Sequence, residues 1–437
     1  MIKSRRLKEV FPLNKIRSMF YMGEMHYPLI LSTLAAVLAL TYYLYLGLLS
    51  SQNMLSYVLA ALFAPSIFFV LFHLLYDLYL IFRSKAFAPL DTAAFREYCP
   101  KVTVMMPVYN EPAELVEKTL NSLKKLDYAN LEILVADESE PDYAQEISKV
   151  CEREGVKFAH KQKDGKGFNA GALRFGVENA SGEIVGIVDS DYHVDPQWLK
   201  KAIPYFGYEQ VGVVNCPQHY SNHDHHVARI VGSFREQGRL KDLARYADGA
   251  LTSSATMILI RKDIFRKYFT GDYMTEDFAF SVRMLFDGRL TFYIPDVLGE
   301  GVGPTNVKHY AKQQMRWLDN FRIFLDFLPK ILKLPKVKVL HLFYHSTQFL
   351  YVIPVYNLLL LGIISGFLEP SLAYAALMVF LLIEVQKFLF IKSVSQYLKL
   401  RDFPAFIYIG LYMYPYLLYE FANILYGGKV AFFRTPK

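Results

Sequence analysis

Long uncharged stretches lie toward both ends of the chain, and a less apolar region separates them. The stretches are residues 28–49, 55–82, 339–367, 372–391 and 403–426. As a helix, about twenty such residues are long enough to cross roughly 30 Å of hydrocarbon. The pattern therefore predicts a membrane-spanning hairpin at residues 28–82 and a second one at residues 339–391.

The last apolar stretch differs from the others because Pro404 and Pro415 interrupt it and Glu420 lies within it. Lys and Arg residues flank the first hairpin and also gather in residues 1–27, between residues 392 and 401, and in the tail at residues 429–437. Basic residues are enriched on the cytosolic side of membrane proteins. We therefore expect a multi-pass plasma-membrane protein with both chain ends inside. Residues 392–428 are expected to form an interfacial or re-entrant helix pair broken at the prolines, with a full transmembrane span as the alternative.

Residues 83–305 alternate short apolar runs with helical patterns. Strands are predicted at 101–108, 131–136 and 184–189, and helices at 114–125 and 169–179. This alternation predicts an α/β domain with a mostly parallel sheet, whose ligands bind at the carboxyl ends of its strands. Neither a GxGxxG nor a GxxxxGK[ST] motif is present, which argues against a dinucleotide fold of the usual kind and against a P-loop. Residues 306–338 combine basic residues with an apolar stripe, as amphipathic helices on a membrane surface do.

Composition supports a membrane protein and argues against several other classes. The chain has 437 residues, 53% of them hydrophobic, and a formal net charge of +7. Because its basic residues lie beside the apolar stretches rather than among aromatic residues, we do not expect nucleic acid as a partner. The three cysteines include no close pair, so neither a disulfide framework nor a zinc knuckle is predicted.

Acidic residues follow the predicted strands where a ligand site is expected. Asp189 and Asp191 come at the end of an apolar run, one residue apart. Two carboxylates so placed in a cleft repel each other, and a divalent cation would compensate for that repulsion. Mg²⁺ or Mn²⁺ is the natural choice, because carboxylates, diphosphate oxygens and water are the ligands that these ions prefer. The alternative is an ordinary surface turn, since this three-residue pattern also occurs by chance.

The sequence Thr-Glu-Asp at residues 275–277 begins an amphipathic helical pattern, with Thr275 as the expected N-cap. Carboxylates are common in a first helical turn simply because they suit the helix dipole. If this turn borders the cleft, Asp277 could instead accept a proton from an acceptor hydroxyl. A second cluster, four histidines and an aspartate within residues 219–226, has no common zinc spacing, so we favour a polar loop there over a structural metal.

Together these motifs resemble those of the processive family 2 glycosyltransferases, the group that contains cellulose, mannan and hyaluronan synthases. In chain order they are PVYNE at 107–111, Asp137, GFNAGAL at 167–173, DSD at 189–191, TED at 275–277 and QQMRW at 313–317. The tail FFRTPK at 432–437 is similar to the FxVTxK gating loop of cellulose synthases, with Arg434 in place of Val. The resemblance implies a cytosolic GT-A-like domain inserted between transmembrane helices.

The resemblance also implies a role for each motif residue. Those expected to contact the nucleotide are Pro107, Tyr109, Glu111, Asp137, Lys166, Asp189, Thr435 and Lys437. Asp189 and Asp191 would hold the metal. The catalytic group would comprise Asp277 as the base, its neighbour Glu276, and Arg316 near the pyrophosphate. Gln313 and Trp317 would contact the acceptor. Asn169 stands where the family motif has Lys, so Lys166 is the expected replacement cation.

The expected function is that of an inverting, metal-dependent hexosyltransferase. It would move a sugar from a nucleotide diphosphate, with UDP favoured and GDP-mannose as the second choice, to a growing polysaccharide or a membrane acceptor, with translocation of the product as a further option. One alternative is a non-processive enzyme that glycosylates a lipid carrier or glycolipid. A more distant alternative is a transporter with a regulatory cytosolic domain, which the lack of repeated intramembrane charge disfavours.

Overall fold

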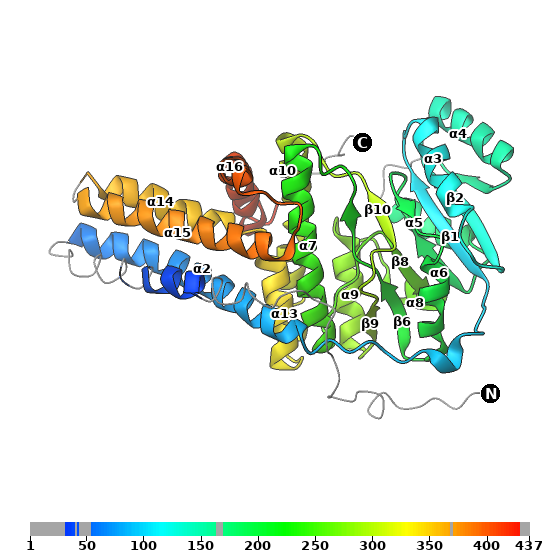
Figure 1. Ribbon diagram of the computed structural model, residues 1–437, viewed down its shortest axis with the longest axis horizontal. Helices are drawn as coiled ribbons and strands as arrows, with labels where there is room; N and C mark the ends of the chain where they lie inside the picture. Colours follow the sequence, from blue (N-terminus) through cyan, green and yellow to red (C-terminus); the bar gives the residue numbers. More distant parts are fainter. Residues whose placement is uncertain (1–30, 40–41, 43–53, 163–168, 368–369, 429–437) are drawn as a thin grey trace.

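The computed structural model describes residues 31–39, 42, 54–162, 169–367 and 370–428. It has two parts, an α/β domain and a bundle of long helices that extends away from it (Figure 1). The domain contains a seven-stranded sheet with the order β3-β2-β1-β4-β8-β6-β9. The strands are β1 (Val102–Val108), β2 (Leu131–Asp137), β3 (Lys157–His160), β4 (Ile184–Ile187), β6 (Val211–Asn215), β8 (Ile258–Arg261) and β9 (Leu290–Tyr293).

The sheet is mixed but mostly parallel. Strands β1 to β4 run parallel to their neighbours among themselves, as do β6 and β9, while β8 is antiparallel to both β4 and β6. Every residue of β1 is buried, as expected for a central parallel strand that is covered on both faces. The predicted α/β sheet is thus confirmed, and the three predicted strands and two predicted helices are all present.

Helices cover both faces of the sheet. Apolar residues of α3 (Ala113–Leu123), α4 (Pro141–Glu154) and α6 (Trp198–Ala202) form one core with one face of β1 and β4. Those of α5 (Asn169–Asn179), α8 (Lys262–Tyr268) and α9 (Glu276–Phe286) form a second core with Met105, Val185 and Ile187 on the opposite face. Because successive strand residues point to opposite faces, each strand supplies both cores.

A 22-residue helix, α7 (His226–Ala247), joins the domain to the long helices. It stands between the sheet and the bundle in Figure 1 and packs against α2 (Met54–Ser84) and α15 (Pro370–Val394). Near its start, Arg229 donates two hydrogen bonds, of 2.9 and 2.5 Å, to the buried carboxylate of Asp402. A second, three-stranded sheet lies beside it, formed by β5 (His193–Val194), β10 (Gly299–Gly301) and β7 (His219–Tyr220). The sequence interpretation had predicted no helix at the residues of α7.

The described residues contain two or three helices that are long and apolar enough to cross a membrane. They are residues 64–84 of α2, residues 373–394 of α15, and the pair α13 (Lys336–Thr347) and α14 (Val352–Ser365), which is bent by 63°. The protein is therefore a membrane protein. Of the expected first span, only residues 31–39 and residue 42 are described, and all of them are helical.

The segment at the C-terminal end folds differently from the broken pair that its prolines suggested. It forms one continuous helix, α16 (Phe403–Leu425), with Pro415 inside it, and α16 is not among the candidate spans. The expected amphipathic segment before the bundle forms three short helices, α10 (Val307–Trp317), α11 (Asp319–Asp326) and α12 (Leu328–Ile331). Residues of α10 and α16 share a buried cluster with α7, which fixes these three helices together.

Candidate active site

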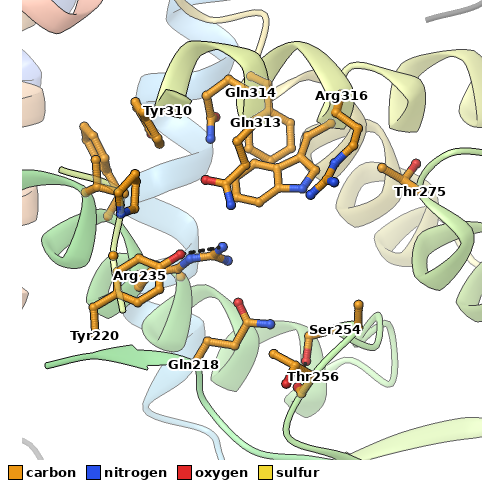
Figure 2. A pocket seen from close by; sticks show the side chains of 18 of the residues that line it. Gln218, Tyr220, Arg235, Ser254, Thr256, Thr275, Tyr310, Gln313, Gln314 and Arg316 are labelled. Carbon is orange, nitrogen blue, oxygen red and sulfur yellow. Dashed lines mark hydrogen bonds between the residues drawn. The ribbon is translucent and has the colours of Figure 1, made fainter. Parts of the chain in front are cut away.

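A cavity of about 730 Å³ lies at the carboxyl ends of β1 and β4 and continues along α7 and α10 to the long helices. Five of the predicted motifs contribute to its wall, although they are far apart in the chain, and Ala172 is the contribution of the GFNAGAL motif. The predicted residues that line it are Pro107, Tyr109, Glu111, Asp189, Asp191, Asp277, Gln313, Arg316 and Trp317. In Figure 2, Gln313, Gln314 and Arg316 extend from one side, and Ser254 and Thr256 lie opposite them.

Not every predicted site residue is among the described residues that line the cavity. Asp137 and Glu276 are not part of the lining, and Lys166, Thr435 and Lys437 fall outside the described residues. Glu138, which follows Asp137, does line the cavity.

The loops after β1 and β2 are joined by the asparagine of the PVYNE motif. Asn110 adopts a left-handed conformation with φ of 51°, which asparagine tolerates better than most residues. Its backbone N–H donates to Ser139 Oγ at 2.7 Å, and its side-chain oxygen accepts the Glu140 N–H at 2.8 Å. Ser139 Oγ in turn donates to Asp137 Oδ1 at 2.5 Å, and His160 Nδ1 lies 2.6 Å from Asp137 Oδ2. The Asp137 carboxylate thus helps to fix the loop after β2, which Asn110 joins to the loop after β1.

The DSD motif is held by a polar loop that precedes β8. The backbone N–H of Asp189 donates to Thr256 Oγ1 at 3.0 Å. At the other end of this loop, Ser253 Oγ lies 2.6 Å from Ser281 Oγ, and Ser281 Oγ donates to the backbone carbonyl of Asp277 at 2.7 Å. The loop therefore connects the two acidic motifs directly.

The TED motif begins α9, but its threonine does not cap the helix as expected. Thr275 is at the N-cap position, yet its side chain makes no cap bond, and its buried Oγ1 has no partner among the described residues. The buried carboxylate of Asp319, at the start of α11, holds the loop instead. Its Oδ2 accepts the backbone N–H groups of Met274 at 2.7 Å and Thr275 at 3.4 Å.

The two carboxyl groups of this motif differ in their surroundings. Burial raises the pKa of both Glu276 and Asp277, and the neighbouring charge of Asp277 raises that of Glu276 further. Arg316 lowers the pKa of both groups, and Arg235 also lowers that of Asp277. Asp277 is therefore the group of the pair that ionises more readily, and it faces the cavity. A carboxylate with a raised pKa is suited to accept a proton near neutral pH.

Helix α10 forms the opposite wall with groups that have unused hydrogen-bonding capacity. Gln313 Oε1 and Gln314 Nε2 are buried and have no partner among the described residues, and the same is true of Asn320 Oδ1. Buried polar atoms are usually paired, so unpaired ones on a cavity wall indicate contact points for ligand hydroxyl groups or for water. The Trp317 ring lies 5.2 Å from that of Phe349, which places it next to the long helices.

The sequence interpretation missed the wall that α7 provides. Residues Phe234, Arg235, Arg239, Asp242 and Arg245 line the cavity from one face of this helix. Their spacing of three and four residues was a usable signal, because charges that recur at that spacing lie on one side of a helix.

The histidine-rich segment has only part of a metal-binding arrangement. His219 Nδ1 lies 2.7 Å from Glu236 Oε1, and the His223 ring stacks on Tyr397 with a centroid distance of 3.5 Å. Within the described part of the chain, no group of three or more His, Cys, Asp or Glu side chains could hold a metal ion.

Comparison with known proteins agrees with this geometry. Residues 100–320, half of the chain and the span from β1 to the start of α11, match the family described as "Glycosyltransferase like family 2". The chain belongs to glycosyltransferase family 2. Its relatives include the cellulose synthase 1 catalytic subunit (UDP-forming) of Komagataeibacter xylinus, 23% identical over 304 residues, or 64% of this chain and 40% of that protein. Glucomannan 4-beta-mannosyltransferase 1 of rice (Oryza sativa subsp. japonica) is 24% identical over 281 residues, or 59% of this chain and 52% of that protein.

The fold is also found in a solved structure. The mannosyltransferase PcManGT from Pyrobaculum calidifontis, in complex with GDP-Man and Mn²⁺, matches with a TM-score of 0.55 and 20% identity, over 74% of this chain and 98% of that one. The chain is thus a family 2 glycosyltransferase with a GT-A-like sheet and long apolar helices before and after it. It spans about half or less of the length of the two curated relatives above, 40% and 52%.

Proposed function

We propose that this protein transfers a hexose from a nucleotide diphosphate sugar to an acceptor that enters the cavity from the membrane side. The observation that supports this proposal most directly is that Asp191, Asp277 and Trp317 line one cavity, which continues to residues of α13, α14, α15 and α16. A donor at the sheet and an acceptor at the long helices can therefore meet at Asp277.

The donor half of the cavity suits a nucleotide diphosphate and a divalent cation. Asp189 and Asp191 are oxygen donors on one wall, and Mg²⁺ or Mn²⁺ commonly takes one or two carboxylates and completes its shell with phosphate oxygens and water. Bound there, the cation would offset negative charge on the pyrophosphate. Pro107, Tyr109 and Glu111 at the end of β1 are placed to contact the nucleoside. We favour UDP because the cellulose synthase relative is UDP-forming; GDP-mannose, the donor in the Pyrobaculum complex, is the second choice.

The reaction is an inverting displacement. The acceptor oxygen forms a bond to the anomeric carbon while the bond from that carbon to the diphosphate oxygen breaks, and the acceptor proton passes to Asp277. Arg316, on α10, stabilises the charge that grows on the leaving diphosphate. No covalent intermediate on the protein is required.

The acceptor half of the cavity is compatible with two kinds of product. Trp317 offers an apolar indole face for a sugar ring, and the unpaired amide atoms of Gln313 and Gln314 suit sugar hydroxyl groups. A growing polysaccharide, with translocation along the long helices, fits this wall. A single transfer to a lipid-linked acceptor uses the same donor half. The basic residues near both chain ends support a plasma-membrane protein with a cytosolic catalytic domain.

The proposed activity is tested by incubating the purified protein with a panel of nucleotide sugars and measuring the free nucleoside diphosphate released with Mg²⁺ or Mn²⁺. We expect one donor to be consumed, and we expect Asp191→Asn to lose most of that activity because it removes one carboxylate of the metal pair. Asp195→Asn, on the exposed surface nearby, is the matched control and should behave as the wild type. Consumption of no donor under either metal would contradict the proposal and favour the transporter alternative.

Product size then separates the two acceptor classes. With a radiolabelled donor, label in a large, glycosidase-sensitive product indicates processive synthesis. Chloroform-extractable label of low mass indicates a lipid acceptor and rules out the polymer.

A further inference from the structure

We infer that Arg235 binds an anionic group of the acceptor, a phosphate or a carboxylate, so that this enzyme selects an acceptor with negative charge. This inference rests on the proposed function and adds a chemical class to its acceptor. No motif of the sequence interpretation includes Arg235, and the mechanism above assigns it no step.

Arg235 projects from the cavity face of α7 into the space beside α10. Its Nη2 donates a hydrogen bond to Tyr220 OH at 3.2 Å, which Figure 2 shows as a dashed line. Its guanidinium carbon lies 4.8 Å from the centre of the Trp317 ring and 5.5 Å from that of Tyr220. The two rings therefore hold the guanidinium group in place beside Trp317, the proposed contact for the acceptor. The hydrogen bond to Tyr220 uses only one of the five N–H donors of Arg235.

Among the described residues, Arg235 has no carboxylate in direct contact. The side chain is half-buried, and the carboxylates of Asp277 and Asp242 interact with its charge from a longer range than an ion pair. Other cations on the same helix are paired: Arg245 lies 3.0 Å from Asp242, and Lys241 lies 4.0 Å from Asp77. A partly desolvated cation without a carboxylate in contact is costly, and a ligand anion would reduce that cost.

The neighbours of Arg235 are suited to an anion. Figure 2 shows the amide of Gln218 below the guanidinium group and that of Gln313 across the cavity from it. Both side chains are neutral, so neither competes for the positive charge, and each has an N–H₂ group that can donate to an anionic oxygen. A planar guanidinium group favours phosphate or carboxylate because it can donate two parallel hydrogen bonds to either.

The position of Arg235 indicates that it contacts the acceptor rather than the donor. Its closest aromatic contact, Trp317, lies against Phe349 at the edge of the long helices, whereas the metal-binding carboxylates follow β4. The charge of Arg235 also lowers the pKa of Asp277. An anion bound to Arg235 would offset that charge, so the base would become a stronger proton acceptor only when the acceptor is present.

Two sources can supply this anion, a lipid phosphate or an acidic sugar. The test is a fluorescence titration of the purified full-length protein in a neutral detergent. The chain has two tryptophans, and Trp198 is fully buried beside the sheet, so a ligand at Arg235 should change the emission of Trp317. The probes are matched pairs: dodecyl phosphate against dodecanol, and glucuronate against glucose. We expect one anionic probe to bind at least about tenfold more tightly than its neutral partner, as for a charge-assisted hydrogen bond.

Substitutions show whether Arg235 causes that preference. Arg235→Gln should abolish the preference, while Arg235→Lys, which keeps the charge but not the planar fork, should retain part of it. Both should bind the nucleotide with Mn²⁺ within about threefold of the wild type. Arg266→Gln, an exposed arginine paired with Glu178, is the control and should change neither.

Three results would overturn the inference. They are equal binding of anionic and neutral probes by the wild type, an unchanged preference in Arg235→Gln, and a loss of nucleotide affinity in Arg235→Gln as large as the loss of probe affinity. The last result would assign Arg235 to the donor. Should Arg235→Gln fail to fold, Arg235→Lys decides the question through its ratio of anionic to neutral binding. The proposed function is tested separately by nucleoside diphosphate release, which needs no acidic acceptor.

Discussion

At the scale of single residues, the adjacent carboxyl groups of Glu276 and Asp277 explain how one of them can act as a base. Both are withdrawn from water, and their charges repel each other, so their protons are coupled. Asp277 faces the cavity and is close enough to Arg235 and Arg316 for both to favour its ionised form. Glu276 is buried and lies outside the cavity lining, and burial with the charge of Asp277 raises its pKa to about 8, so it stays protonated while Asp277 ionises.

This assignment predicts the effect of Glu276→Gln on pH dependence. Because Asp277 ionises first, Glu276 is uncharged while it does so, and glutamine mimics that uncharged form, so the acid limb of kcat/KM should stay in place. Because the folded-state pKa of Glu276 is raised, any stability that its protonation contributes is present at acid pH and lost as pH rises through that pKa. The variant should therefore also unfold at a higher temperature than the wild type at pH 8. A pH–rate profile and a thermal melt check both, and an acid limb that moves to lower pH would show that Glu276 is already charged when Asp277 titrates.

At the scale of elements, the active site depends on how α11 holds the start of α9. The Asp319 carboxylate is completely buried, accepts two backbone N–H groups of the loop before Glu276, and pairs with Arg322 at 2.6 Å. It touches no ligand site itself, so we regard it as a positioning residue. Its place two residues after Trp317 means that the acceptor wall and the base are positioned by the same turn.

Asp319→Ala should lower kcat, and Asp319→Asn should restore part of it. The alanine variant leaves two buried N–H groups and Arg322 without their acceptor, each loss costing about 1–3 kcal/mol, whereas asparagine keeps one carbonyl oxygen. We expect kcat to fall by roughly tenfold or more in Asp319→Ala, since a misplaced base costs rate steeply, while the KM for the donor changes little. Steady-state kinetics at saturating acceptor measure this. A rise in donor KM with unchanged kcat would show that Asp319 acts elsewhere.

The sequence predicted the elements whose patterns are local and missed those that depend on tertiary packing. Strand β1 and helix α5 were found because their apolar positions alone define them. Helix α7 was missed because its cavity face is charged, so it has no apolar stripe on that side. The break expected at Pro415 did not occur, because contacts of α16 with α10 and α14 support one continuous helix.

The same division applies to the site. DSD, TED and QQMRW were recognised from their order in the chain, and the fold brings them to one cavity. Arg235 and Asp319 belong to no short motif, and their importance comes from groups distant in sequence, such as Tyr220 and Met274. The nucleotide contact expected of Asp137 stays a prediction, while its carboxylate contacts with Ser139 and His160 are ones that only the folded chain brings together.

At the scale of the whole molecule, the cavity extends from the sheet to the long helices. Under the proposed function, the donor therefore enters at the catalytic domain and the acceptor at the membrane.

The proposed cytosolic position of the catalytic domain can be tested through its cysteines. Cys99 is exposed at the edge of the domain, whereas Cys151 and Cys216 are buried. A membrane-impermeant maleimide should therefore label the protein only after the cells are permeabilised, and Cys99→Ser should lose that labelling. Labelling of intact cells at Cys99 would place the domain outside.

The central claim is that Asp277 deprotonates an acceptor beside a separately built nucleotide site. The most direct measurement compares Asp277→Asn with the wild type in two assays, equilibrium binding of the nucleotide with Mn²⁺ and transfer of sugar from the identified donor. We predict that transfer falls by a factor on the order of 10² or more, while nucleotide affinity stays within a few-fold. Retained transfer, or an equal loss of binding and transfer, would contradict the account.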